Sequence, residues 1–452
     1  MNFPSAFIDR IQLQFPDSHT DFFEALEGEA HTSIRVNKRK SASQSTMQPV
    51  PWSLRGFYLP IRPQFTLDPT FHAGAYYVQE ASSMFLDTVL EYIKKDVSLD
   101  RVLDMCAAPG GKSTLILDHL NENQFLIANE IVDNRNAILR ENLTKWGFPN
   151  FAVTQNDAKH FGQMTDYFDA IFVDAPCSGE GLFRKDEKAR AEWTPENVQK
   201  CSIRQMDILE NIWEGLNPNG YLVYSTCTYN PEENEVLLRR FRDKGFEFES
   251  IEIALNPSWN ITKIEQNNIK GYAFLPHKTK GEGFFCSVLK KKSSDEPKTW
   301  TPARIIEKKE CLSHYIASKY LQDYTAFAFQ ESLNLVCKNL LAELGNLRKH
   351  LYFKQFGILM GSEMKGKFIP DHGLALCSLL DLDKIVSYEV SQYQALQYLS
   401  KEVFDTATLP KDYVLLTHKA LPIGWIKNME GRHNNLYPKN WRILMDWKSR
   451  LQ

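Results

Sequence analysis

The chain has 452 residues, 43% of them hydrophobic and 24% charged, and its formal net charge at pH 7 is −3. This length exceeds the usual size of one domain, and the near-average composition excludes fibrous or wholly disordered architectures. The first ten residues lack the pattern of a secretory signal, and no stretch approaches the ~20 apolar residues that cross a bilayer. We therefore expect a cytoplasmic chain of several domains with no membrane partner, and a monomer as the simplest assembly.

Eight cysteines are scattered along the sequence without any Cys-x-x-Cys pair. In a chain without an export signal, such cysteines are better interpreted as reduced thiols than as a disulfide framework or a zinc site. We therefore expect no metal site, and some of the thiols are candidates for chemistry.

Residues 1–75 combine two helical patterns, Phe7–Phe15 and Thr20–Leu26, with a strand-like run at Ser33–Asn37. A Ser/Gln/Pro-rich stretch follows at 41–51. These patterns predict a small α+β region before the main domain.

Residues 76–291 alternate strands and helices, which is the pattern of a parallel α/β sheet. The expected strands are Val102–Met105, Phe125–Ala128, Phe151–Thr154, Ala170–Val173, Tyr221–Tyr224 and Gly283–Leu289, and the expected helices are Lys112–Leu120, Asn134–Trp146 and a long helix opened by Thr194-Pro195. A capping threonine followed by proline is a typical helix start, and a glycine such as Gly147 is a typical helix end.

A charged and polar run, Lys290–Pro297, offers nothing to bury, and we place a linker there, over 292–312. Helical periodicity resumes around Ala317–Leu344, and strand-like patterning returns at Tyr413–Thr417. We expect an intermediate region over 313–395 and a C-terminal α+β region over 396–452. From Lys411 onward, eight Lys or Arg stand against three Asp or Glu, interleaved with five Tyr and Trp residues. This composition fits nucleic-acid binding and a solvated domain with an aromatic core equally well.

The predicted strand Val102–Met105 runs into Cys106-Ala107-Ala108-Pro109-Gly110-Gly111-Lys112-Ser113 and then into a helix. Small residues let a ligand approach the backbone, and the free amides of a helix start favour an anionic or carboxylate group. The segment resembles the end of a phosphate-binding P-loop, but the first glycine of that motif is replaced by Cys106 and Pro109 stiffens the turn. We therefore disfavour an NTPase.

Three carboxylates follow consecutive predicted strands. Glu130 stands ~20 residues past the turn, where folds of this kind bind ribose hydroxyls. Asp157 follows the third strand, where it could accept a hydrogen bond from an adenine amino group, and Asp174 ends the fourth. Each alone would more often be a surface or capping residue, but together at one sheet edge they indicate a ligand site.

Two cysteines also stand at this edge: Cys177 in Asp174-Ala175-Pro176-Cys177-Ser178-Gly179, and Cys227 in Ser225-Thr226-Cys227-Thr228-Tyr229. A single cysteine is more often a buried apolar residue than a nucleophile. Both occupy loops where this architecture holds its ligands, and a helix start near Glu232 would favour a thiolate. Position alone leaves the two interchangeable.

Taken together, these segments resemble the Sun and Nop family of RNA cytosine-5 methyltransferases, and in particular its bacterial RsmF type, over most of the chain. The resemblance implies a Rossmann-like class I methyltransferase domain (α/β), a small α+β N-terminal region and a C-terminal α+β PUA-like RNA-binding region. It also implies S-adenosylmethionine as the cofactor, with the turn Cys106–Lys112 at its methionine end, Glu130 at the ribose, Asp157 on the adenine side, and Asp174 as the acid of the Asp-Ala-Pro-Cys motif.

The resemblance also separates the two cysteines. Carbon 5 of cytosine is too weak a nucleophile to take a methyl group unassisted, and a thiolate added at carbon 6 supplies the missing electron density. In the family the Thr-Cys cysteine, here Cys227, attacks, and the Pro-Cys cysteine, here Cys177, aids product release. Asp174 could stabilise the addition as a hydrogen-bond donor only from a buried site.

Outside the site, Arg35-Val36-Asn37 resembles the N-terminal signature of the family, and Pro276-His277 with Gly281–Phe285 resembles the end of its catalytic domain. One departure is that Tyr272-Ala273-Phe274 stands where the family often has an arginine. The runs Gly424–Lys427 and Asn435–Lys439 resemble the PUA-like domain.

That likeness favours RNA contact at the C-terminal end of the chain. We expect Lys427, Arg432, Lys439 and Arg442 to neutralise phosphates, while an aromatic side chain stacks on an unpaired base. Arg184 and Lys185 are candidates for RNA contact beside the active-site loop, or else solvated charges.

The substrate expected from the resemblance is structured RNA, small-subunit ribosomal RNA or the 30S subunit first, with transfer RNA as a close alternative. A second alternative is a non-catalytic ribosome-assembly factor, against which the presence of both motif cysteines argues. A third, methylation of a protein or small molecule, would leave the basic C-terminal region without use.

Overall fold

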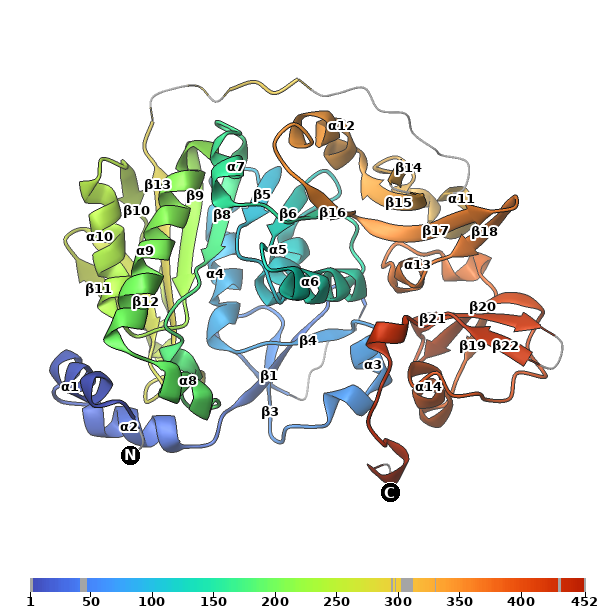
Figure 1. The fold of residues 1–452 in the computed structure, drawn as a ribbon, viewed down its shortest axis with the longest axis horizontal. Coiled ribbons are helices and arrows are strands. Elements are labelled where there is room, and N and C mark those ends of the chain that lie inside the picture. Colours follow the sequence, from blue (N-terminus) through green and yellow to red (C-terminus); the bar gives the residue numbers. More distant parts are fainter. Residues whose placement is uncertain are drawn as a thin grey trace.

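The computed structural model describes residues 3–40, 47–293, 296, 298–301, 312–329, 331–429 and 432–450. Figure 1 shows the chain as a large central α/β unit, with the N-terminal helices at its lower left and the C-terminal unit at its lower right. Among the described residues, no helix combines the length and apolarity that crossing a membrane requires.

The N-terminal unit is a helix pair followed by an antiparallel sheet. Its elements are α1 (Ser5–Gln14), α2 (His19–Glu27), β1 (Thr32–Val36), β2 (Gln48–Pro49), β3 (Gly56–Leu59), α3 (Pro69–His72) and β4 (Tyr76–Val78), with the strand order β2-β3-β1-β4. β4 pairs with Ile34–Val36 of β1, so this sheet extends past residue 75, where the sequence places the boundary.

The central unit is built on a mixed sheet with the order β11-β12-β13-β9-β8-β5-β6-β7-β16, and β10 pairs with β13. Its strands are β5 (Arg101–Asp104), β6 (Phe125–Asn129), β7 (Phe151–Thr154), β8 (Phe168–Asp174), β9 (Leu216–Thr226), β10 (Phe248–Ser250), β11 (Thr262–Gln266), β12 (Ile269–Phe274) and β13 (Phe284–Lys291). β5 to β9 are parallel, and β13 joins β9 antiparallel. Five strand ends therefore lie on one edge.

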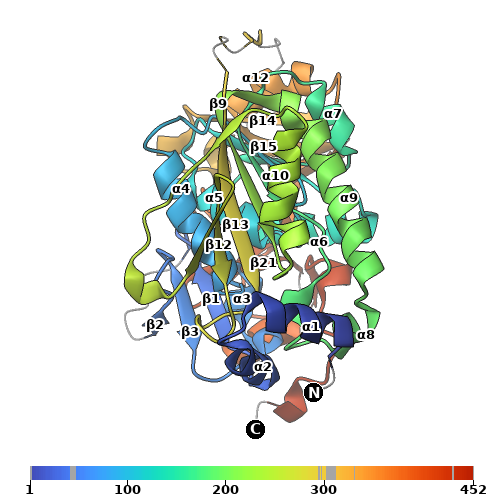
Figure 2. The same cartoon turned by 90° about the vertical axis from the view of Figure 1, so that its left-hand side faces the viewer.

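The parallel strands β5 to β8 are largely buried, whereas the edge strand β11 has no buried residue. Helices cover both faces of this sheet. They are α4 (Leu86–Ile93), α5 (Gly111–His119), α6 (Asp133–Trp146), α7 (Ala158–Gly162), α8 (Glu187–Glu192), α9 (Pro195–Ile212) and α10 (Glu235–Asp243). α4, α5 and α6 contact one another in one layer, and α7, α9 and α10 form the other. Figure 2 shows α4 on one side of the sheet and α9 and α10 on the opposite side.

The intermediate unit differs from its sequence prediction. Its elements are α11 (Leu312–Tyr315), β14 (Tyr324–Phe329), β15 (Ser332–Cys337), α12 (Lys338–Leu347), β16 (Phe353–Phe356), β17 (Ile358–Met364), β18 (Lys367–Pro370) and α13 (His372–Leu376). The helical prediction for Ala317–Leu344 is wrong over 324–337, where β14 and β15 pair antiparallel. Apolar periodicity over a short run fits either structure, and the aromatic residues of β14 favour a strand once a partner is present.

One strand of the intermediate region belongs to the central sheet. β16 pairs antiparallel with β7 and forms the outer strand of that sheet. Next to it, the Asn156 side chain accepts from Tyr352 N at 2.9 Å and donates to Tyr352 O at 3.0 Å. The intermediate region is therefore joined to the central unit by backbone hydrogen bonds as well as by a shared apolar core.

The C-terminal unit contains β19 (Ser387–Glu389), α14 (Gln392–Leu399), β20 (Asp412–His418), β21 (Leu421–Met429) and β22 (Arg432–Asn435), with the strands in that order. β19 pairs with β20, although it precedes residue 396, where the sequence places the start of this unit. The unit has its own apolar core and contacts α3 and α13.

Much of the expected linker, 292–312, lies outside the described residues. Trp300, within the described part, packs its ring against Tyr167 at a centroid distance of 5.1 Å and donates from Nε1 to Asp166 O at 3.3 Å. This part of the expected linker is therefore anchored to the central unit.

Candidate active site

A glycine-containing turn joins β5 to α5. Gly110 precedes the helix with φ of +113°, a conformation that costs glycine little. Asp104, at the end of β5, is buried and accepts from Ser113 Oγ at 2.6 Å, which ties the strand to the first turn of α5. Its Oδ1 has no hydrogen-bond partner among the described residues, and burial raises the pKa of this carboxyl to about 7.

A cavity of about 360 Å³ opens beside this turn, a size within the usual range of small-molecule sites. Its walls come from four segments: the β4 region (Tyr77–Glu80, Ser83), the turn (Cys106–Pro109, Gly111, Lys112), the loops after β8 and β9 (Asp174, Gly181, Leu182, Lys185, Cys227) and the start of β13 (Glu282–Phe284). The cavity thus collects nine expected site residues, namely Cys106, Ala107, Ala108, Pro109, Gly111, Lys112, Asp174, Lys185 and Cys227. Gly110, Glu130, Asp157, Cys177 and Arg184 are outside its lining.

The two motif cysteines meet because β8 and β9 are adjacent and parallel. The Sγ atoms of Cys177 and Cys227 are 2.9 Å apart, and Cys227 N donates to Cys177 Sγ at 3.3 Å. Cys227 lines the cavity, whereas the partly exposed Cys177 is not part of its lining. The hydrogen bond with Cys227, and then burial, raise the pKa of the Cys177 thiol well above its ordinary value.

A cation lies in the same cavity. Lys112 Nζ is 2.7 Å from Asp174 Oδ2. Burial by itself lowers the pKa of Lys112, but the charge and hydrogen bond of Asp174 outweigh it, and the net shift is upward. Lys112 therefore brings a fixed positive charge to the wall that Cys227 shares.

Asp174 does not have the enclosed setting that a donor role needs. Its side chain is 33% exposed, it faces the Lys112 ammonium, and it accepts from Ser225 Oγ at 2.9 Å. Both of these partners are donors, so Asp174 acts here as a hydrogen-bond acceptor.

Glu130 and Asp157 stand farther along the same sheet edge. Glu130 is buried, accepts from Val132 N at 2.9 Å and lies 3.4 Å from Arg135 Nη2. The same Arg135 nitrogen donates to Ala108 O at 3.0 Å, which links Glu130 to the turn. Asp157 is exposed and caps α7 by accepting from Lys159 N.

The structure places Arg184 and Lys185 differently from each other. The Arg184 side chain is only 3% exposed and donates to Gly281 O at 3.1 Å, so its guanidinium is not presented to RNA as expected. Lys185 lines the cavity and lies 3.1 Å from Glu282 Oε1. Arg184 thus stabilises the segment at Gly281 and Glu282. Lys185, in contrast, faces the site.

The basic residues of the C-terminal unit are largely accessible. Arg432, Lys439 and Arg442 are exposed, and the partly buried Lys427 holds its ammonium 5.1 Å from the Tyr413 ring centroid. Three aromatic residues that were candidates for base stacking, Trp425, Tyr437 and Trp447, are buried in cores instead. Tyr413 and Trp441 remain partly exposed.

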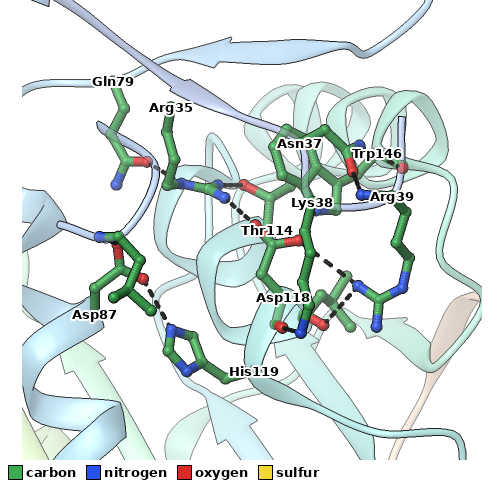
Figure 3. A network of polar contacts seen from close by, with 12 residues as sticks. Arg35, Asn37, Lys38, Arg39, Gln79, Asp87, Thr114, Asp118, His119 and Trp146 are labelled. Carbon is green, nitrogen blue, oxygen red and sulfur yellow. Dashed lines mark hydrogen bonds and ion pairs between the residues drawn. The ribbon is translucent and has the colours of Figure 1, made fainter. Parts of the chain in front are cut away.

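Figure 3 shows the polar contacts that residues of the N-terminal signature make with α5 and its surroundings. Buried Arg35 donates to Asp118 Oδ2 and to Thr114 Oγ1, each at 2.6 Å, and its guanidinium lies 4.5 Å from the Trp146 ring centroid. Asn37 donates to Gly74 O and Trp146 O, both at 2.9 Å. The N-terminal unit is therefore locked onto the helix whose first turn forms the cavity wall.

Sequence reasoning missed the contribution of the β4 region. Tyr77, Gln79 and Glu80 line the cavity, and Glu80 Oε1 accepts from Glu282 N at 2.8 Å across the site. No local motif marks these residues. The only available signal was the placement of a short strand just before the parallel sheet.

In the described part of the chain, no group of three or more neighbouring His, Cys, Asp or Glu side chains could hold a metal ion.

Three regions of the chain match known protein families. Residues 3–81 match the N-terminal domain of 16S rRNA methyltransferase RsmF, residues 91–290 match 16S rRNA methyltransferase RsmB/F, and residues 386–443 match the methyltransferase RsmF PUA domain.

Individual relatives agree over the whole length. A protein of Escherichia coli (strain SE11) named ribosomal RNA small subunit methyltransferase F is 30% identical over 470 residues, which cover 97% of this chain and 96% of the relative. The protein of the same name from Pectobacterium carotovorum subsp. carotovorum (strain PC1) is 29% identical with the same coverage.

Solved structures share the fold of the central part. A methyltransferase homolog protein from Pyrococcus horikoshii is 28% identical with a TM-score of 0.54, covering 64% of this chain and 95% of that one. NSun6 from Pyrococcus horikoshii, solved with SFG, is 20% identical with a TM-score of 0.54, covering 65% and 99%. With three matched regions and a relative 30% identical from end to end, the chain belongs to the RsmF family of 16S rRNA methyltransferases.

Proposed function

We propose that this chain transfers a methyl group from S-adenosylmethionine to carbon 5 of a cytosine in 16S rRNA, acting as a monomer on RNA of the small ribosomal subunit in the cytoplasm. The observation that carries the proposal is that Cys227 shares one cavity with Lys112 and with the turn after β5, while its sulfur lies 2.9 Å from the Cys177 sulfur. The choice of 16S rRNA as the substrate rests on the names of the relatives, since no feature of the cavity itself selects one RNA over another.

The residues along the sheet edge fit the cofactor by the chemistry of their donors and acceptors. The small residues Cys106–Pro109 leave room for its methionine end beside the cavity. The Glu130 carboxylate offers acceptors for ribose hydroxyls, and the exposed Asp157 carboxylate offers one for the adenine amino group. When bound, S-adenosylmethionine supplies an electrophilic methyl group.

Cys227 acts as the nucleophile. Its thiolate adds to carbon 6 of the cytosine, forming the carbon–sulfur bond and moving the electron pair of the carbon 5–carbon 6 double bond toward carbon 5. The Lys112 ammonium stabilises the negative charge of the thiolate, and Asp174 holds that ammonium in place. Cys177 is the poorer candidate for the attack because it lies outside the lining of the cavity.

Cys177 acts after carbon 5 has gained its methyl group. The carbon 5 proton leaves to water, the double bond re-forms, and the carbon–sulfur bond breaks with its electron pair returning to Cys227. The Cys177 thiol is placed to donate a hydrogen bond to the departing thiolate. Without that donor the adduct should persist.

The target cytosine must leave its stack to reach a cavity of this depth. Lys185 faces the incoming nucleotide at the cavity mouth, and Lys427, Arg432, Lys439 and Arg442 contact phosphates from the C-terminal unit. Tyr413 and Trp441 are the accessible rings for stacking on an unpaired base.

In vitro methylation tests the proposal. The purified chain would be incubated with radiolabelled cofactor and, in parallel, with naked 16S rRNA, 30S subunits and transfer RNA, and 5-methylcytosine would be located by bisulfite sequencing. We expect label at a cytosine of 16S rRNA or 30S subunits. Label confined to transfer RNA would support that alternative substrate, and RNA binding without label would support an assembly factor.

A further inference from the structure

The segment that carries Cys177 is held on both sides by one buried network. On the preceding side, Gln205 Nε2 donates to Pro176 O at 2.9 Å. On the following side, Ser178 N donates to Glu233 Oε1 at 2.8 Å, and Ser178 Oγ donates to Glu233 Oε2 at 2.5 Å.

The two holding side chains also contact each other. Gln205 Nε2 donates to Glu233 Oε1 at 3.0 Å, and both side chains are fully buried. Gln205 comes from the middle of α9, and Glu233 comes from the short 3-10 helix Pro231–Glu233 after the Cys227 loop. The hydroxyl of Tyr224 donates to Glu233 O at 2.6 Å and fixes that turn to β9.

Cys227 is held by other groups. Gly181 N donates to Cys227 O at 2.8 Å, and the neighbouring Thr228 Oγ1 lies 3.1 Å from Ser178 Oγ. No hydrogen bond of the Gln205 or Glu233 side chain reaches Cys227 or Thr228 in the described part of the chain. The side chains of Gln205 and Glu233 thus bond directly to the residues on either side of Cys177, and they reach the Cys227 loop through Ser178 Oγ and Cys177 Sγ.

We infer that Glu233 and Gln205 are positioning residues that hold the Cys177 thiol against Cys227 Sγ and thereby serve release of the methylated cytosine, not the attack on it. The inference rests on the proposed function and adds two residues to it. A buried carboxylate that accepts two hydrogen bonds from Ser178 restrains the backbone next to the thiol. A displacement of about 1 Å would weaken the donor contact and cost up to ~100-fold in rate.

The test compares adduct and turnover in Glu233→Ala, Glu233→Gln and Gln205→Ala, with Cys177→Ala as the reference. Glu232→Ala and Gln199→Ala are matched controls, because these neighbours are exposed on the same two helical segments. Adduct is measured by denaturing gel shift with labelled 16S rRNA, turnover by methyl incorporation, and cofactor affinity by calorimetry.

We expect Glu233→Ala and Gln205→Ala to lose about 10- to 100-fold in turnover while the adduct persists as in Cys177→Ala, with cofactor affinity unchanged. Glu233→Gln should recover most of the turnover, because an amide oxygen can still accept from Ser178 N. Loss of turnover without adduct in folded variants, or no change, would overturn the inference. If Glu233→Ala fails to fold, the turnover and adduct of Gln205→Ala decide whether the inference holds. Absence of adduct in Cys177→Ala itself would instead refute the proposed division between the cysteines.

Discussion

Lys112 Nζ lies 2.7 Å from Asp174 Oδ2, across a cavity wall that also carries Cys227. The sequence places Lys112 in a cofactor-binding turn, but its ammonium extends from the start of α5 toward the loop after β8. This ion pair joins the turn on which the cofactor is expected to the cysteine that is expected to attack.

Removing the Lys112 charge should therefore slow the chemical step. We expect Lys112→Met to lower kcat by about 100-fold, because a preorganised charge beside the nucleophile is removed, while the cofactor affinity changes little. Exposed Lys159→Met, on the same sheet edge, should leave kcat unchanged. Steady-state methylation of 16S rRNA measures both, and an unchanged kcat in Lys112→Met would mean that this ammonium does not assist Cys227.

The buried Asp104 carboxyl should make stability depend on pH. Its pKa is raised from 3.8 to about 7 in the folded chain, so the folded state binds this proton more tightly than the unfolded state. The resulting stability is fully present below about pH 4 and is lost as the pH rises through about 7.

Asp104→Asn removes this dependence. Relative to the parent, the variant should gain about 4 kcal/mol in the free energy of unfolding between pH 4 and pH 8, measured with urea. Exposed Asp100→Asn serves as the control. A constant difference between the Asp104→Asn variant and the parent across that range would show that Asp104 titrates normally.

The central sheet was predictable because its parallel strands are buried on both faces and read as short apolar runs bounded by turn residues. The site was predictable to the extent that it depends on strand ends: Cys106, Asp174, Cys177 and Cys227 all follow such runs. Position in the sequence could not rank the two cysteines. The cavity favours Cys227, since Cys177 is not part of its lining.

Pairings between distant segments were not predictable. β16 pairs with β7 across some 200 residues, and no local pattern specifies that partner. β14 and β15 were predicted as part of a helix for the same reason, because a strand is stabilised by a neighbour that its own sequence does not reveal. The cavity wall from β4 likewise depends on how the N-terminal unit docks.

That docking supports a stability prediction. Arg35→Met should lower the free energy of unfolding by about 3–5 kcal/mol, because it leaves Asp118 buried without its nearest cation. Exposed Arg450→Met should change it by less than about 0.5 kcal/mol. Urea unfolding measures both, and equal small effects would show that the Arg35 network contributes little to the fold.

The C-terminal charges should govern RNA affinity through salt. Replacing Lys439 and Arg442 by Gln should weaken binding to a 16S rRNA fragment and reduce the slope of log affinity against log salt by about 0.7–0.9 for each phosphate that is no longer neutralised. Lys263→Gln is a suitable control, because β11 lies at the opposite end of the central sheet from β16. Parallel binding curves for the double variant and the parent would show that these side chains do not bind phosphate.

The division of work between the two cysteines is tested most directly by trapping the adduct. Cys177→Ala and Cys227→Ala would each be incubated with cofactor and labelled 16S rRNA, denatured and separated by gel electrophoresis. Our account predicts a covalent protein–RNA band with Cys177→Ala, and neither band nor methylated product with Cys227→Ala. A covalent band that survives in Cys227→Ala would contradict it.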